Sequence, residues 1–249
     1  METSSTGLSE RDRLYADRRE QVEAFVFDER VAAVFGDMIT RSVPGYATIV
    51  AMTGLLAHRH ARPGGRLYDL GCSLGAASAV MAESGVPEEC RILAVDKAPA
   101  MIARARAALS ERGLEERVDL LCADVREVEI RNASVVVLNF TLQFLPTGDR
   151  LALLRRIRRG MRDDGVLILS EKIAGATPEE DRLLVELHEA FKRANGYSEL
   201  EISQKRAALE QVLVPEPVAV HRRRLRQAGF GGVDLWFQCF NFASFVARP

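Results

Sequence analysis

The chain has 249 residues, of which 47% are hydrophobic and 28% charged, a composition typical of a soluble globular protein. Its formal net charge of −1 gives no bulk attraction for nucleic acid. No apolar run is long enough to span a membrane, and the first twenty residues lack the apolar core of a signal peptide. We therefore expect a cytoplasmic protein without a membrane partner.

Residues 1–26 are mostly polar and charged, and we expect them to form a flexible N-terminal tail ahead of a single domain at 27–249. The four cysteines form no C-x-x-C pair, so we expect reduced thiols. His58 and His60 lie two residues apart at an expected helix end, and no metal site is expected there.

Strands and helices alternate along most of the chain. After helices at about 28–41 and 47–60, the expected elements are a strand at 66–70, a helix at 76–84, a strand at 91–96, a helix at 99–113, strands at 118–124 and 133–140, a helix at 149–161 and a strand at 165–172. This alternation predicts an α/β fold with a doubly wound, mostly parallel sheet. Helices at 178–194, 199–213 and 217–228 precede the last strands within 233–247, so an extra helical insert is expected at about 178–213.

The segment YDLGCSLG, at 68–75, predicts a strand, a tight turn and the start of a helix. Gly71 and Gly75 permit a sharp turn and the close approach of a ligand, although two glycines alone also fit a plain turn. Asp96, Asp124 and Asn139 end the next three strands, and open α/β sheets bind ligands at these carboxyl ends. The combination predicts a nucleoside site in which Asp96 accepts hydrogen bonds from ribose hydroxyls.

The turn also narrows the choice of nucleoside. A dinucleotide fingerprint requires a glycine where this chain has Ser73, and no G-x-x-x-x-G-K-[ST] phosphate loop is present. The D-L-G-x-x-x-G turn, with the acids and amide that end the following strands, resembles the class I S-adenosyl-L-methionine (SAM) methyltransferase superfamily. The resemblance implies a seven-stranded Rossmann-type sheet and SAM as a substrate, without a metal.

A closer resemblance covers nearly the whole chain from Phe27. The segments FDERVAAVF, RSVPGY, YDLGCSLGAA, NASVVVLNFTLQFL, LSEK, FKRANGYSELEISQKR and LWFQCFNF resemble the carboxy-S-adenosyl-L-methionine synthase family. The resemblance implies conversion of SAM and prephenate into carboxy-SAM and phenylpyruvate by a homodimer. It also implies that the product passes to a tRNA carboxymethyltransferase, for the 5-oxyacetyl modification of the tRNA wobble uridine.

The resemblance also assigns site residues. It implies SAM contacts at Tyr46, Gly71, Cys72, Ser73, Asp96, Lys97, Asp124, Val125 and Asn139. It gives Arg206 a catalytic role, holding the carboxylate on the former methyl carbon through the two parallel N–H donors of a guanidinium. Lys97 departs from the family pattern, in which a small polar residue such as Asn is expected.

Two other functions fit the same residues. One is an ordinary SAM-dependent methyltransferase, which would show a catalytic base or a basic groove beside the methyl group. The other is a non-catalytic SAM-binding regulator. The arginine runs at 155–159 and 222–226 are interpreted as solvated helix faces, so direct tRNA binding is not expected.

Overall fold

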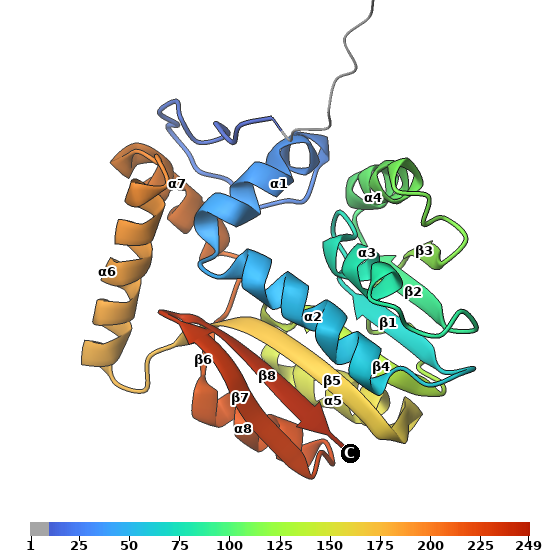
Figure 1. Cartoon of the computed structure of the whole chain (residues 1–249). Coiled ribbons are helices and arrows are strands. Elements are labelled where there is room, and N and C mark those ends of the chain that lie inside the picture. The colour runs from blue at the N-terminus through green and yellow to red at the C-terminus, as the bar shows by residue number, and fades with distance from the viewer. Residues whose placement is uncertain (1–9) are drawn as a thin grey trace, which may run out of the picture.

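The computed structural model describes residues 10–249, and its centre is a twisted sheet (Figure 1). The strand order is β3-β2-β1-β4-β5-β8-β7, with β6 paired to β5. The strands are β1 (Arg66–Leu70), β2 (Arg91–Asp96), β3 (Val118–Cys122), β4 (Ala133–Asn139), β5 (Met161–Ala174), β6 (Glu216–Pro217), β7 (Gly232–Cys239) and β8 (Phe242–Arg248). Strands β1 to β5 are parallel, and β8 runs antiparallel to both β5 and β7.

This arrangement confirms the predicted doubly wound, mostly parallel sheet along the seven-strand path. Strand β6 was not predicted, because two residues give no readable periodicity. Adjacent residues of β4 enter different cores: Val135 and Val137 pack on one face, and Val136 and Leu138 pack on the other. A strand buried on both faces reads as a continuous apolar run, as 133–138 does apart from Ser134.

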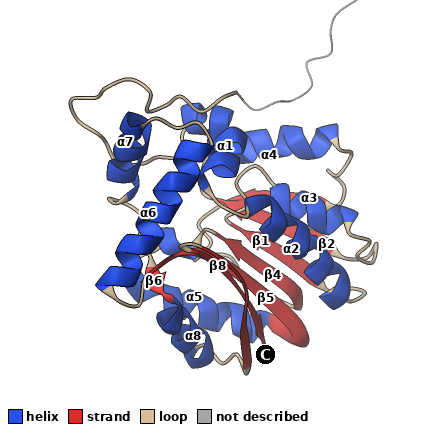
Figure 2. Cartoon of the chain, turned by 60° about the vertical axis from the view of Figure 1, so that its left-hand side comes forward, coloured by secondary structure: helices blue, strands red, loops and turns tan. Residues whose placement is uncertain are grey.

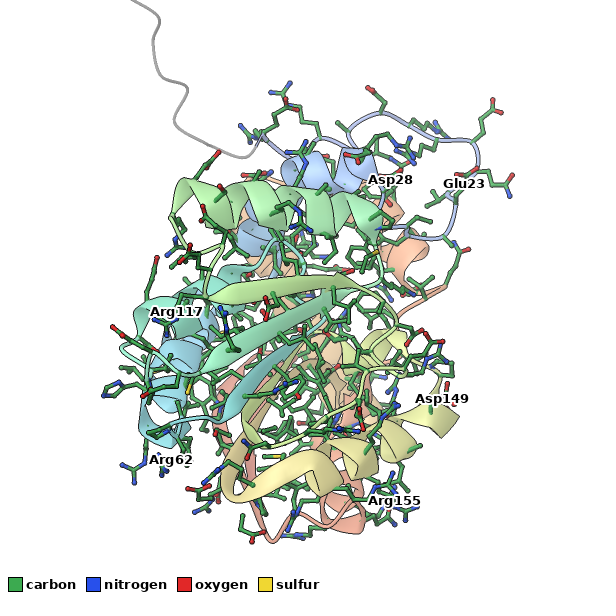
Figure 3. The ribbon with its side chains drawn as sticks, turned by 90° about the vertical axis from the view of Figure 1, so that its right-hand side faces the viewer. Glu23, Asp28, Arg62, Arg117, Asp149 and Arg155 are labelled. Carbon is green, nitrogen blue, oxygen red and sulfur yellow. The ribbon has the colours of Figure 1, made fainter. Side chains whose placement is uncertain are left out.

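Helices cover both faces of the sheet (Figure 2). One face carries α2 (Tyr46–His60), α3 (Ala76–Glu83) and α4 (Pro99–Glu111), and the other carries α5 (Thr147–Gly160) and α8 (Val218–Gln227). The arginine run at 155–159 lies on α5, and Figure 3 shows Arg155 projecting from the outer surface of that helix. Within the described residues, no helix is both long and apolar enough to cross a bilayer.

A smaller helical layer is formed by α1 (Glu29–Ser42), α6 (Pro178–Ala194) and α7 (Glu199–Leu209), which lie together at one side of the sheet in Figure 1. Each of these helices begins at a capping residue. Asp28 caps α1 and Thr177 caps α6 by accepting backbone N–H groups, and Ser198 with Glu201 forms a capping box at the start of α7. Helices α6 and α7 occupy the region where the insert was expected. Helix α7 ends at Leu209, before the expected position 213.

Residues 10–26 do not form the flexible tail that their composition suggested. Tyr15 and Phe25 are buried in a core cluster with α1 and Ala208. Gln204 on α7 donates hydrogen bonds to the carbonyl oxygens of Tyr15 and Asp17, each at 2.9 Å. Two buried aromatic side chains therefore hold a mostly polar segment in place. The average composition of the segment does not show this. The remainder of the predicted tail, residues 1–9, lies outside the described residues.

Candidate functional site

A cavity of about 740 Å³ opens where the carboxyl ends of β1, β2, β4 and β5 meet the layer of α1, α6 and α7. This volume is within the range of small-molecule sites. Its lining includes every SAM contact that the resemblance implied: Tyr46, Gly71, Cys72, Ser73, Asp96, Lys97, Asp124, Val125 and Asn139. The structure therefore brings together residues that lie up to about ninety positions apart in the sequence, as expected for strand ends in one sheet.

The turn after β1 is shaped for close approach. Gly71 has φ +87°, and a Cβ at this position would lie 2.0 Å from the Thr141 Oγ1. Its N–H donates to the Val95 carbonyl oxygen at 2.7 Å, which ties the turn to β2. Ser73 adopts φ +51°, a left-handed conformation that a non-glycine residue rarely takes. Such conformations persist where the surrounding contacts fix them, and they cluster at binding sites.

Asp96 at the end of β2 supplies one of those contacts. Its Oδ2 accepts the Ser73 N–H at 3.0 Å, and its Oδ1 accepts the Ala98 N–H at 2.9 Å. Burial raises the pKa of Asp96, and these two hydrogen bonds act against that rise. A carboxylate has about four acceptor positions, so Asp96 keeps capacity for ligand hydroxyls.

Asn139 at the end of β4 presents an unused donor. Its Oδ1 accepts the Ser170 hydroxyl at 2.8 Å, which fixes the orientation of the amide. Within residues 10–249 the buried Asn139 Nδ2 has no hydrogen-bond partner. A buried donor without a partner is costly, and a ligand oxygen in the cavity would satisfy it. The amide therefore fits a polar ligand group in the cavity.

Asp124, which is half-buried, and Lys97, which is exposed, also line the cavity. Arg126 Nη2 contacts Asp124 Oδ2 at 2.7 Å, and its hydrogen bonds lower the pKa of this carboxyl. Asp124 thus stays ionised and can still accept a hydrogen bond from a ligand. The Lys97 side chain, which departs from the family pattern, is exposed at the cavity.

The opposite wall is cationic, which sequence reasoning missed. Lys172 on β5, Lys192 on α6 and Lys205 on α7 all line the cavity. Lys205 Nζ pairs with Asp12 Oδ2 at 3.1 Å and contacts Ser42 Oγ at 3.0 Å. For Lys172 and Lys192, no carboxylate among residues 10–249 lies within the ion-pair distance of 4.0 Å.

Burial and mutual repulsion alter these cations. Burial, followed by the charges of Lys172 and Lys205, lowers the pKa of Lys192 to about 7. Burial also lowers the pKa of Lys172. His188, one turn before Lys192, has its pKa lowered to about 3 by burial and then by Lys192. His188 is therefore neutral near pH 7, and its Nε2 lies 2.8 Å from the Ser42 carbonyl oxygen, to which a neutral imidazole donates.

Comparison with known proteins places these features in a family. A family model described as a methyltransferase domain matches residues 67–165. The carboxy-S-adenosyl-L-methionine synthase of Trichlorobacter lovleyi is 60% identical over 95% of this chain and 97% of its own length. The synthase of Aliivibrio fischeri is 50% identical over 95% of this chain and 98% of its own length. The chain belongs to the carboxy-S-adenosyl-L-methionine synthase family. It is accordingly a SAM-dependent enzyme of the transferase class.

Solved structures agree on the fold. An O-methyltransferase family protein from Burkholderia thailandensis superposes with a TM-score of 0.62 at 17% identity, and human N-acetylserotonin methyltransferase in complex with SAM does so with 0.60 at 18%. They cover 89% and 88% of this chain, respectively. This chain spans only 60% and 55% of those two proteins, so the likeness concerns the shared methyltransferase-type domain.

Arg206 is the one predicted site residue of this carboxy-SAM synthase family member that does not line the cavity. Its side chain is 51% exposed. Its Nη1 lies 3.2 Å from Glu189 Oε1 and its Nε lies 2.6 Å from Glu210 Oε1. These ion pairs hold the guanidinium between Glu189 of α6 and Glu210, which follows α7. The expectation that Arg206 holds the reacting carboxylate directly stays a prediction.

A sequence signal for the missed lysine does exist. The buried residues of α6 are Leu184, His188 and Lys192, which are spaced four residues apart and share one helix face. A lysine on the apolar face of an amphipathic helix is unusual, because lysine is rarely buried without a partner. That exception could have marked Lys192 as a functional residue. Across the described residues, no group of three or more His, Cys, Asp or Glu side chains is placed to hold a metal ion.

Proposed function

We propose that this enzyme converts SAM and prephenate into carboxy-SAM and phenylpyruvate. The observation that carries the proposal is the division of one cavity into two ends. Strand-end residues such as Asp96 and Asn139 form a nucleoside end, and Lys172 and Lys192 form a cationic end. An enzyme that uses a nucleoside together with a dicarboxylate needs both. The names of the relatives, which call them carboxy-S-adenosyl-L-methionine synthases, support the same product.

At the nucleoside end, we assign the ribose hydroxyls to Asp96, and the adenine to Asp124 and Val125. Asn139 and the turn at 71–73 would hold the methionyl part. Two of these groups have free hydrogen-bonding capacity: the Asp96 carboxylate has unfilled acceptor positions, and the Asn139 Nδ2 has no partner among the described residues. SAM carries a positive sulfonium. The acids at this end of the cavity attract that charge, whereas Lys172 and Lys192 would repel it.

The proposed reaction balances without a side-chain base. Prephenate loses CO2 and hydroxide as its ring becomes aromatic, which leaves phenylpyruvate. The hydroxide removes a proton from the sulfonium methyl group, giving water and an ylide. The ylide carbon then forms a carbon–carbon bond with the CO2, giving carboxy-SAM. The protein's part is to exclude bulk water, keep CO2 beside the ylide and offset the carboxylate charge.

The wider setting is also a proposal. We place the reaction in the cytoplasm, in a homodimer whose product is used by a tRNA carboxymethyltransferase to modify the wobble uridine. These statements rest on the family resemblance. Neither arginine run borders the cavity, and Arg224 of the second run pairs with Glu216 within the fold, which supports a reaction on small molecules and not on bound tRNA.

The proposal is tested by incubating the purified chain with SAM and prephenate, and analysing the products by mass spectrometry. We expect a nucleoside heavier than SAM by one CO2, together with phenylpyruvate in equal amount. Transfer of an intact methyl group to another acceptor would favour an ordinary methyltransferase. Binding of SAM with no prephenate-dependent product would favour a non-catalytic regulator.

A further inference from the structure

We propose that Lys172 and Lys192 form a carboxylate-binding site for a dianionic co-substrate. The assignment of this dianion as prephenate rests on the proposed function. The site itself is argued from the contacts, burial and charge of the cavity. It gives the enzyme a co-substrate specificity element that is separate from the nucleoside residues.

The acids of the cavity lie at one end, with the exposed Lys97 beside them, and the buried or half-buried cations lie at the other. The acids Asp69, Asp96 and Asp124 lie at or near the ends of β1, β2 and β3. The cations Lys172 and Lys192 come from β5 and α6, and they lie close enough together for the charge of Lys172 to lower the pKa of Lys192. A ligand that spans the cavity therefore meets acceptors at one end and ammonium groups at the other.

Lys192 is the stronger part of the argument. The residue is 7% exposed, and no ion pair of its Nζ is found among residues 10–249. Lys205, on the neighbouring helix, is 4% exposed, and its Nζ pairs with Asp12. A buried lysine is usually paired with a carboxylate in this way. An ammonium that is buried at a cavity wall without a counter-charge is unfavourable in the free protein. It becomes favourable when an anion binds against it.

Two carboxylates near the lysines form ion pairs with Arg206. Glu189 lies on α6 between His188 and Lys192, and Glu210 follows the end of α7. Arg206 engages both, with Nη1 on Glu189 and Nε on Glu210. The guanidinium thus neutralises the carboxylates that would otherwise compete with a ligand for Lys172 and Lys192. Arg206 acts here as a positioning residue.

The remaining wall suits a ring. The Phe242 ring packs edge-on against the neutral His188 at 4.9 Å and against Phe140 at 6.0 Å between centroids. These rings line the same cavity as the two lysines. A cyclic molecule with carboxylates would place its ring on the aromatic wall and its charges on Lys172 and Lys192.

The test uses Lys192→Met and Lys172→Met, with Arg182→Met as a matched control. Arg182 is also a cation on α6, but its side chain is 66% exposed. Prephenate binding is measured by calorimetry on the full chain saturated with S-adenosylhomocysteine, and turnover is measured with SAM. We expect each lysine variant to weaken prephenate binding at least about tenfold and to raise the KM for prephenate. The dissociation constant for S-adenosylhomocysteine should stay within about twofold, and Arg182→Met should match the wild type.

The outcomes separate this site from the proposed function. If the wild type makes carboxy-SAM and both lysine variants keep their prephenate affinity, the lysine site is wrong and the function stands. If the wild type makes no carboxy-SAM but binds prephenate in a Lys192-dependent way, the site stands and the proposed function is wrong. Lys192→Met should unfold at the same or a higher temperature than the wild type, because it removes a buried unpaired charge. Marked destabilisation of both lysine variants would show that these side chains are structural and overturn the inference.

Discussion

The backbone N–H of Ser73 donates a hydrogen bond to the Asp96 carboxylate at 3.0 Å. This bond joins the glycine-rich turn after β1 to the end of β2, so that one acid both shapes the turn and faces the cavity. The left-handed conformation of Ser73 is fixed in part by this contact. The glycine-rich turn and the acid at the end of β2, which together predicted a nucleoside site, are therefore joined by a direct hydrogen bond.

Asp96→Ala should weaken SAM binding by at least about tenfold. It removes the ribose acceptor, and hydrogen bonds to a charged group contribute about 1.5–3 kcal/mol each. It also releases the Ser73 N–H, so the turn loses a support. Calorimetry on folded variant protein measures the change. A dissociation constant equal to that of the wild type would remove Asp96 from the binding site.

Gly71→Ala should destabilise the fold more than Gly64→Ala. Both glycines have positive φ, +87° and +69°, so each alanine meets a backbone penalty of about 1–2 kcal/mol. Only at Gly71 would the new Cβ collide with Thr141, which adds about 1–3 kcal/mol of overpacking. Urea unfolding compares the two variants. Equal losses of unfolding free energy would show that the crowding at Gly71 is relieved without cost.

Arg206→Ala should leave SAM affinity unchanged and weaken the binding of prephenate and of carboxy-SAM. Arg206 is half exposed in the two ion pairs that it breaks, so the fold should lose no more than about 1 kcal/mol. Arg206 could act by neutralising the two acids or by contacting the ligand directly, and these two explanations can be distinguished. If Arg206 acts by neutralising Glu189 and Glu210, then changing both acids to Gln in the Arg206→Ala background should restore binding.

Direct contact between Arg206 and the ligand, in another conformation or from a neighbouring subunit, would leave the triple variant as weak as Arg206→Ala. The measurement is a set of dissociation constants for SAM, carboxy-SAM and prephenate on each variant. Equal affinity of Arg206→Ala and the wild type for all three ligands would contradict both routes.

Prephenate binding should weaken as pH rises above about 7. The pKa of Lys192 is lowered to about 7, so the free protein loses this positive charge as pH increases, and an anion must then recruit a proton. The cost rises by at most about 1.4 kcal/mol per pH unit, or about tenfold. Lys172, Lys205, Glu189 and Arg206 act on the same group, and the Lys192→Met variant isolates its share. Calorimetry between about pH 6.5 and about pH 8.5 should show a steeper dependence for the wild type than for Lys192→Met.

The same shift has a consequence for stability in the absence of ligand. Between about pH 7 and the unfolded value of 10.5, the unfolded chain holds the Lys192 proton and the folded chain does not. Unfolding free energy contributed by this group therefore rises with pH across that window. Below about pH 7 both states are protonated, and the full burial penalty of the ammonium is present.

The clustering of the strand-end residues in one cavity was predictable from sequence, because it depends on topology. Asp96 and Asn139 end parallel strands, and parallel strands in one sheet bring their carboxyl ends to the same edge whatever the intervening helices do. Periodicity also located α6 and the start of α7 correctly. These inferences needed only the order of elements and the geometry of a doubly wound sheet.

The cationic end depends on how α6 packs over that sheet, which periodicity does not describe. The sequence places Lys192 on the apolar face of α6, but only the packing of that face makes it part of a cavity wall. On α7, Ile202 is buried, but the Arg206 side chain four residues later is exposed. Periodicity does not show this difference either, because it depends on how α7 packs. Tyr15 and Phe25 likewise anchor a segment whose average composition is polar. In each case a single side chain's burial, set by tertiary contacts, decided the outcome.

The most direct test of the account uses prephenate labelled with carbon-13 in its ring carboxylate. The purified enzyme is given unlabelled SAM and the labelled prephenate, and both products are analysed by mass spectrometry. The account predicts that the label appears in the new carboxyl group of carboxy-SAM and that phenylpyruvate is unlabelled. Carboxy-SAM without the label, or a methylated product with no carboxy-SAM, would contradict the transfer of CO2 from prephenate to the sulfonium methyl carbon.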